Sequence, residues 1–178
     1  PSAPDLDYMA MTRNEGPAPE VLEAVRNRYK NAVRHSDAVL GRVLDALERA
    51  DLAADTWVLV TGDHGEEFRE CGFFGHTSAF TPEQLAVPFL LRGPGIANGV
   101  ERRPTSHLDF APTLLEFLGA EPARRARWTL GENLFSPPER RKRVSAGWNE
   151  LGLWVEDGIV RVPLSGYAFD IEVFDRGW

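Results

Sequence analysis

The stretch that decides the fold is VLVTGDHGEE, residues 58–67. Three apolar residues, Val58 to Val60, follow Trp57 without interruption, a pattern typical of a strand covered on both faces. Gly62 and Gly65 permit a sharp turn of the backbone where this strand stops. We therefore predict a buried β-strand that ends in a tight turn.

Asp63 and His64 stand inside this turn. Adjacent side chains point to opposite faces within a strand, but they can converge where the strand ends. Ligands of open α/β sheets bind outside the carboxyl ends of the strands, and an oxygen ligand beside an imidazole suits Zn²⁺, Mn²⁺ or a related divalent ion. The alternative is local: the aspartate caps a following helix and the histidine hydrogen-bonds a carbonyl.

A third polar ligand, His76, follows twelve residues after His64, between Gly75 and Thr77. The intervening loop has an irregular and polar composition. We expect its aromatic residues to anchor it and to keep the site dry. These polar, glycine and aromatic residues are Glu66, Glu67, Glu70, Gly72, Phe68, Phe73 and Phe74.

The stretch TGDHGEEFRECGFFGHTSAF (61–80), followed by VPFLLRGPG (87–95), resembles the alkaline phosphatase superfamily and, within it, the sulfatase-like branch. The segment RYKNAVRHSDAVLGRVLDAL (28–47) looks like that family's helix ahead of the metal strand. The segment SHLDFAPTLLEFLG (106–119) looks like the helix after its second strand. The order and spacing of all three blocks agree with the family.

The resemblance implies an α/β fold: the C-terminal part of a sulfatase/alkaline-phosphatase-like sheet with flanking helices, plus a small antiparallel β subdomain. Asp63 and His64 match the family's late metal-ligand pair, for a divalent ion that is Ca²⁺, Mg²⁺, Mn²⁺ or Zn²⁺. His76 stands where typical sulfatases have a lysine that grips the sulfate, and in phosphoester-handling relatives a histidine near this point binds a second metal or the substrate oxyanion. His76 is therefore both a metal and a catalytic candidate, and it tilts the expectation from sulfate toward phosphate esters.

The family's nucleophile is a Thr, Ser or modified Cys in the N-terminal part, and nothing before residue 28 matches that block. Asp5 and Asp7 lie in a Pro-rich opening, and Cys71 lies after the metal pair and outside a C-x-P-x-R setting. The chain thus resembles the C-terminal portion of a larger enzyme, and we expect no turnover by it alone. The parent would be a hydrolase of sulfate or phosphate esters, or a phosphoglycerol- or phosphoethanolamine-type transferase. The alternative is a non-catalytic binding domain of an envelope protein, so a periplasmic or membrane-anchored parent is compatible with the sequence.

The composition is that of a globular protein, with 178 residues, 43% hydrophobic and 26% charged. The net charge of −7 argues against a nucleic-acid partner, and no segment reaches the length of a membrane span. The basic run at 140–143 is a solvated loop or a patch for an anionic lipid or substrate. A single Cys excludes an internal disulfide.

The order of turn residues and apolar runs along the chain predicts three segments. They are an irregular opening at 1–17, the sulfatase-like α/β part at 18–122, and a connector with the antiparallel subdomain at 123–178. We predict a helix from about 19 to 50, with His35 and Asp37 in structural roles and Gly41 at a close packing contact. Its predicted core face consists of Leu22, Val25, Tyr29, Val33, Leu40, Val43, Leu44 and Leu47.

The second half is predicted from capping and turn signals. A strand at 88–92 ends in the turn 93–95, and a helix runs from Asp109 as N-cap to Leu118, with Gly119 after it. His107 either reaches the metal loop or holds a loop against the sheet. Strands are expected at 144–148, 151–156, 158–162 and 169–174, with Asp157-Gly158 as a hairpin turn and with Trp148, Trp154 and Trp178 packed among them. An unpaired sheet edge would be a template for pairing with a second copy, so we expect a homo-oligomer.

Overall fold

The structure is a computed structural model that describes residues 11–12, 16–77, 79–121, 129–137, 143–155, 158–164 and 172–175. The chain divides into two compact units, one within residues 1–97 and one within residues 98–177. Among the described residues, no helix combines the length and the apolar character that crossing a bilayer requires. The segment boundaries predicted at 17 and 122 stay a prediction.

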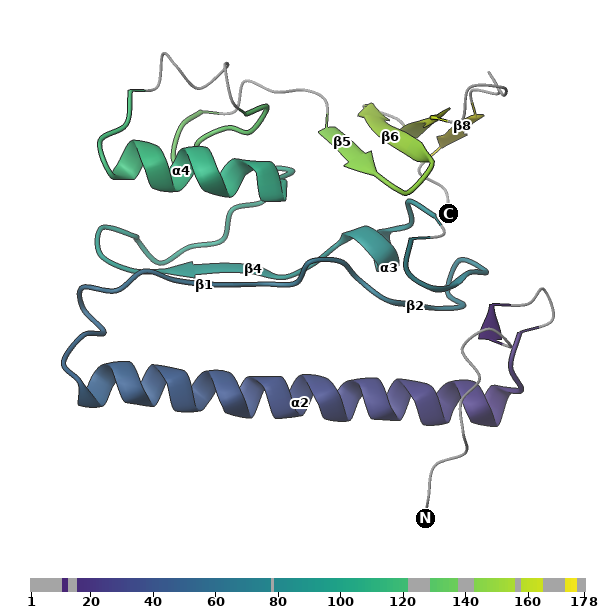
Figure 1. Ribbon diagram of the computed structural model, residues 1–178, viewed down its shortest axis with the longest axis horizontal. Coiled ribbons are helices and arrows are strands. Elements are labelled where there is room, and N and C mark those ends of the chain that lie inside the picture. The colour runs from purple at the N-terminus through teal and green to yellow at the C-terminus, as the bar shows by residue number, and fades with distance from the viewer. Residues whose placement is uncertain are drawn as a thin grey trace. The chain divides into compact units, whose positions relative to one another are not determined.

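The first unit begins with the long helix α2, Pro19–Arg49 (Figure 1). Pro19 is tolerated in the first turn because its missing N–H would have no helical partner there, and Glu20 complements the positive end of the helix. The helix therefore matches the predicted range within one residue.

The predicted metal strand is β1, Val58–Thr61, and it pairs in antiparallel fashion with β4, Phe89–Arg92 (Figure 1). The register joins Val58 to Arg92 and Thr61 to Phe89. Behind β4 the chain turns at 93–95 as predicted. Gly93 is required there because an added Cβ would lie 2.2 Å from Cδ1 of Trp57.

The predicted burial of β1 is wrong for this chain. Val58 to Val60 are half-buried and Thr61 is exposed. The reason is that β1 and β4 form a sheet of two strands among the described residues, and two strands cannot cover each other's faces.

The loop after β1 is more regular than predicted. It forms a small hairpin of β2, Glu67–Phe68, and β3, Phe74–Gly75, followed by the short helix α3, Pro82–Leu85. Phe68 and Phe74 are buried and pack with Met11 against α2, which confirms them as anchors. Phe73 is 40% exposed, so its predicted anchoring role is wrong, because it lies in the turn between the two strands.

The predicted core face of α2 is only partly covered. Leu22 and Val25 pack on the β2–β3 hairpin, whereas Tyr29, Val33 and Val43 stay exposed. The predicted close packing at Gly41 is also wrong, since an added Cβ would meet nothing within 4 Å. His35 and Asp37 lie on the exposed surface of this helix.

The second unit contains a 3-10 turn, η1 (His107–Asp109), that leads into helix α4, Phe110–Phe117. Asp109 occupies the predicted N-cap position of α4, but its side chain caps η1 instead, accepting from the amide of Ser106 at 2.7 Å. The same carboxylate accepts from the amide of Glu132 at 2.9 Å, so it also fixes the segment at 129–137. Gly119 follows the helix with a φ of 90°, as predicted for a residue after the C-cap.

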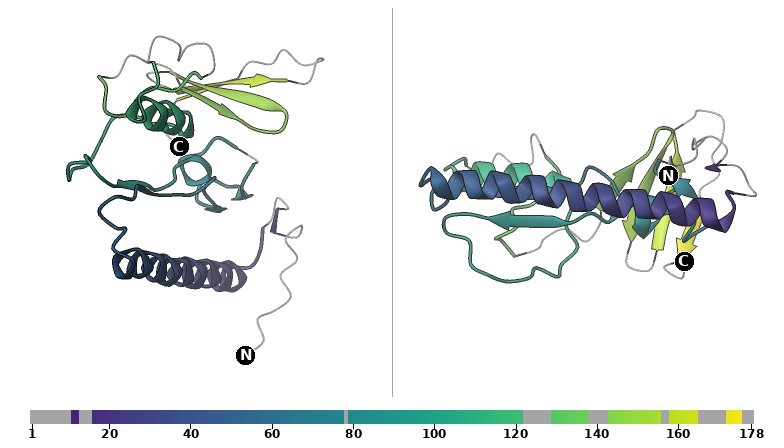
Figure 2. Two further views of the ribbon diagram at one scale, coloured as in Figure 1. Left: turned by 60° about the vertical axis from the view of Figure 1, so that its left-hand side comes forward. Right: turned by 90° about the horizontal axis from the view of Figure 1, so that it is seen from below.

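The predicted antiparallel subdomain is confirmed as one sheet of β5 (Arg143–Ala146), β6 (Glu150–Val155), β7 (Gly158–Pro163) and β8 (Glu172–Asp175), in that order. Its strands are the yellow-green arrows of Figure 2. Trp154 is half-buried, donates to the hydroxyl of Ser145 at 2.9 Å and stacks under Arg143. Trp148 is 84% exposed, so its predicted packing is wrong; it lies in the bend between two strands. Asp157 and Trp178 lie outside the described residues.

Candidate metal centre

The register of the β2–β3 hairpin explains how residues ten apart in sequence meet. Glu67 pairs with Gly75 and Phe68 pairs with Phe74. The next position along this antiparallel register sets Glu66 opposite His76, at the open end of the hairpin. Nδ1 of His76 lies 2.8 Å from a carboxylate oxygen of Glu66, which confirms that the two side chains meet.

His64 completes a cluster of three with Glu66 and His76. The imidazole of His64 stacks on that of His76, with 3.8 Å between the ring centroids and 24° between their planes. Each of the three side chains offers one ligand atom, and these atoms all lie within 4.8 Å of one another. Among the described residues this group has the donor chemistry and the spacing to hold a divalent metal ion.

The hydrogen bonds fix which ring nitrogens are free to bind. Nδ1 of His64 lies 2.8 Å from the carbonyl oxygen of Gly65, and a carbonyl can only accept, so this nitrogen carries the proton. By the same argument, Nδ1 of His76 donates to the ionised carboxylate of Glu66. Both Nε2 atoms are then unprotonated in the neutral rings, which is the form that binds a metal.

Asp63 lies beside the cluster and is 91% exposed. One of its carboxylate oxygens is 3.6 Å from Nε2 of His64. Two ligand atoms that each lie about 2.1 Å from one tetrahedral ion are about 3.4 Å apart, so the pair is spaced to share an ion. Hydrogen bonds from the backbone amides of Asp63 itself and of His64 lower the pKa of the Asp63 carboxyl, which keeps it ionised.

Helix α3 docks against the glycine that separates these ligands. The amide of Gly65 donates to the carbonyl oxygen of Gln84 at 2.8 Å. A Cβ at Gly65 would lie 2.0 Å from the carbonyl oxygen of Glu83, so only glycine permits this approach. The second glycine of the GDHG turn therefore serves the packing of the site on α3.

Backbone strain occurs next to His76. Thr77 has a φ of 71°, in the left-handed region that a β-branched residue rarely adopts. Such conformations persist where the surrounding structure enforces them, and they are concentrated at functional sites.

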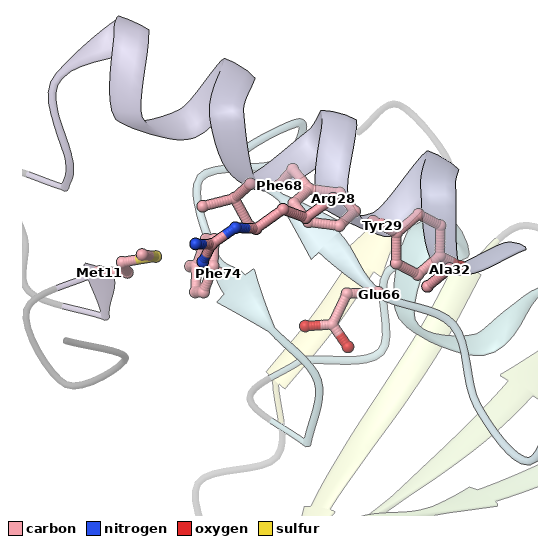
Figure 3. A pocket seen from close by; sticks show the side chains of 8 residues that line it. Met11, Arg28, Tyr29, Ala32, Glu66, Phe68 and Phe74 are labelled. Atoms are coloured by element: carbon pink, nitrogen blue, oxygen red, sulfur yellow. The ribbon is translucent and has the colours of Figure 1, made fainter. Parts of the chain in front are cut away.

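A pocket of about 360 Å³ adjoins the cluster between α2 and the hairpin (Figure 3). Glu66 belongs to both: it lines the pocket and it contacts His76. Figure 3 shows Met11 and Glu66 on either side of Phe74 and the guanidinium group of Arg28. The remaining lining residues are Val25, Arg28, Tyr29, Ala32, Phe68 and Phe74.

Comparison with known proteins decides the family. The profile of the family described as Sulfatase matches residues 3–120. The chain belongs to the sulfatase family. The choline-sulfatase of Rhizobium meliloti (strain 1021) is 34% identical over 115 residues, which cover 65% of this chain and 22% of that protein. An arylsulfatase of Volvox carteri is 32% identical over 104 residues, or 56% of this chain and 16% of that protein.

Solved structures agree on the fold of this sulfatase-family chain. A phosphonate monoester hydrolase from Silicibacter pomeroyi superposes with a TM-score of 0.75 at 21% identity, over 98% of this chain and 37% of that chain. This likeness confirms the predicted fold class. The chain spans about a fifth of the length of the two curated relatives named above.

The cluster differs from the predicted set of Asp63, His64 and His76 by one residue. The sequence indicates Glu66 only as a polar loop residue, yet it contacts His76 directly. The contact of Glu66 with His76 follows from the register of the hairpin. Strands of two residues are too short for this register to be predicted from the sequence. His107 is exposed in η1 of the second unit, and its role at the metal loop stays a prediction.

Cys71 is expected to react slowly for a thiol. Burial and a hydrogen bond from its Sγ to the carboxylate of Glu83 (3.2 Å) raise the pKa of Cys71 from 9.0 to about 11. At pH 8 this two-unit rise lowers the thiolate population, and with it the rate of alkylation by iodoacetamide, about a hundredfold relative to an unperturbed thiol. Mass spectrometry of the native and the urea-unfolded protein measures both rates. Equal rates in the two states would contradict the assignment.

Proposed function

We propose that this chain supplies the metal-binding part of a divalent-metal-dependent ester hydrolase, with sulfate esters as its first substrate class. The observation that carries the proposal is the convergence of His64, Glu66 and His76, with Asp63 beside them. The named relatives, a choline-sulfatase and an arylsulfatase, favour sulfate esters. Such an ion supplies Lewis-acid polarisation of the ester and stabilises the charge that develops on it.

Each side chain has a distinct task in this proposal. Asp63 and Nε2 of His64 hold the ion. His76 presents Nε2 either as a further ligand or as a donor, once protonated, to an anionic ester oxygen. Glu66 orients the ring of His76 and fixes its tautomer, which is the usual work of a carboxylate behind a metal-site histidine.

Phosphate esters are the second candidate substrate class, and this candidate rests on His76 alone. His76 stands where the sulfatase pattern has a lysine, and a histidine there is the feature that the resemblance associates with phosphoester chemistry. The ester class is therefore decided by direct comparison of p-nitrophenyl sulfate with p-nitrophenyl phosphate and bis-p-nitrophenyl phosphate.

The experiment compares the complete protein that carries these residues with its Asp63→Ala form. We expect one ester class to be turned over, with bound metal and activity both lost in the variant. Asp37→Ala, an exposed aspartate on α2, is the matched control and is expected to change neither. A parent that binds no metal and cleaves none of the esters would overturn the proposal in favour of a binding domain. We expect the 178 residues alone to show no turnover, because none of them matches the family's nucleophile block.

A further inference from the structure

A buried carboxylate that the proposed chemistry does not use lies at the centre of this loop. Glu67 has no exposed surface, and its neighbours Thr81 and Gln84 are 0% and 2% exposed. Burial of an ionised carboxylate is costly unless hydrogen bonds replace the lost water. The surroundings of Glu67 supply these bonds.

The carboxylate of Glu67 accepts four hydrogen bonds, two on each oxygen. One oxygen accepts the backbone amides of Cys71 at 3.0 Å and Phe73 at 2.8 Å. The other accepts the hydroxyl of Thr81 at 2.7 Å and the side-chain amide of Gln84 at 2.9 Å. One side chain thus joins β2, the turn of the hairpin, and the start and body of α3.

The two faces of β2 make different kinds of contact. Phe68 points the opposite way from Glu67, because neighbouring side chains in a strand alternate. Phe68 packs on α2, with its ring centroid 5.2 Å from that of Tyr29, on the wall of the pocket in Figure 3. The hairpin is therefore held by apolar contacts on one side and by the Glu67 network on the other.

This network lies directly behind the candidate ligands. Glu66 precedes Glu67, and His76 follows Gly75, the strand partner of Glu67. The side-chain amide of Gln84 donates to Glu67, and the backbone carbonyl oxygen of Gln84 accepts from the amide of Gly65. Movement of Glu67 would thus displace all three members of the cluster together.

We propose that Glu67 is a positioning residue of the metal centre, which fixes His64, Glu66 and His76 relative to one another without contacting the ion. The inference rests on the proposed function in that the site it positions is the proposed metal centre. Outer residues of this kind typically change metal affinity about 10–100-fold when they are replaced.

The test exchanges the two partners of one hydrogen bond. In Glu67→Gln the new amide group faces the amide of Gln84, so two donors meet. The double variant Glu67→Gln/Gln84→Glu restores a donor facing an acceptor. Its new carboxylate at position 84 can still accept from the amide of Ala79, as the side-chain oxygen of Gln84 does at 3.1 Å. The matched control is Asp109→Asn, which disturbs an equally buried loop-fixing carboxylate in the second unit.

Two readouts are recorded at a temperature where every variant is folded. Isothermal titration with Zn²⁺ alone is expected to show a loss of affinity of at least about tenfold in Glu67→Gln, recovery in the double variant, and no change in Asp109→Asn. Because the two rings stack, we expect ring-current shifts of the ring protons of His64 and His76 in NMR spectra; these shifts are expected to be lost in Glu67→Gln and regained in the double variant.

The outcomes separate the two proposals. If the wild type does not bind Zn²⁺, the proposal fails for Zn²⁺ as the ion of this centre, whereas the ring shifts still report whether Glu67 positions the histidines. If the wild type binds Zn²⁺ and Glu67→Gln changes neither affinity nor ring shifts, the positioning role is wrong. A loss in Glu67→Gln that the double variant does not recover would assign the effect to general destabilisation and would also overturn it.

Discussion

Replacement of Gly65 by alanine is expected to destabilise the first unit and to disrupt the metal centre at the same time. The new Cβ would lie 2.0 Å from the carbonyl oxygen of Glu83 and 2.9 Å from its carbonyl carbon, and both are backbone atoms that no side-chain rotation can move. Either α3 or the GDHG turn must shift. Forced overpacking of this kind costs about 1–3 kcal/mol of unfolding free energy.

Urea denaturation measures this loss, and Gly41→Ala is the matched control. Gly41 lies in the middle of α2, where an added Cβ meets nothing within 4 Å. Alanine there is expected to stabilise the helix by up to about 1 kcal/mol, because it restricts the unfolded chain and favours helix. If Gly65→Ala proved as stable as Gly41→Ala, the close approach of α3 to the turn would be wrong.

Replacement of His64 by alanine is expected to remove most of the metal affinity. His64 offers Nε2 beside the carboxylate of Asp63 and stacks on His76, so the variant loses one proposed ligand and the ring contact with a second, His76. Since replacement of outer residues already costs about 10–100-fold, loss of a ligand is expected to cost at least about a hundredfold.

Zn²⁺ titration and metal-dependent thermal stabilisation both report this loss, because a ligand that binds the folded state stabilises it more as its affinity rises. The control is His35→Ala, which removes an exposed histidine of α2 outside the cluster and is expected to leave both readouts unchanged. Equal losses in the two variants would mean that surface histidines bind the metal nonspecifically.

Much of the fold could be read from local patterns. The range of α2 followed from helical spacing and from Pro19, and β1 followed from an apolar run that stops at glycine. The antiparallel subdomain followed from short alternating runs with turn residues between them. These features depend on neighbouring residues, so the sequence displays them directly.

Burial was the part that local pattern misjudged. Val33 and Val43 share the apolar stripe of α2 and yet are exposed, because the hairpin packs on the residues that precede them. Tyr29 meets Phe68 of the hairpin with one edge of its ring and still stays 46% exposed. Trp148 is apolar and exposed because it lies in a bend rather than in a strand. Periodicity shows which face of an element is apolar, but only the neighbouring elements decide whether that face is covered.

The sequence by itself determined the family, the longer helices and strands, and the candidates Asp63, His64 and His76, because these rest on residue types in short, ordered blocks. Only the tertiary structure decided that Glu66 faces His76 and that Glu67 lies buried behind them. Two adjacent glutamates look alike in sequence. The hairpin register places Glu66 beside His76, and the approach of α3 buries Glu67. Both depend on contacts between residues far apart along the chain.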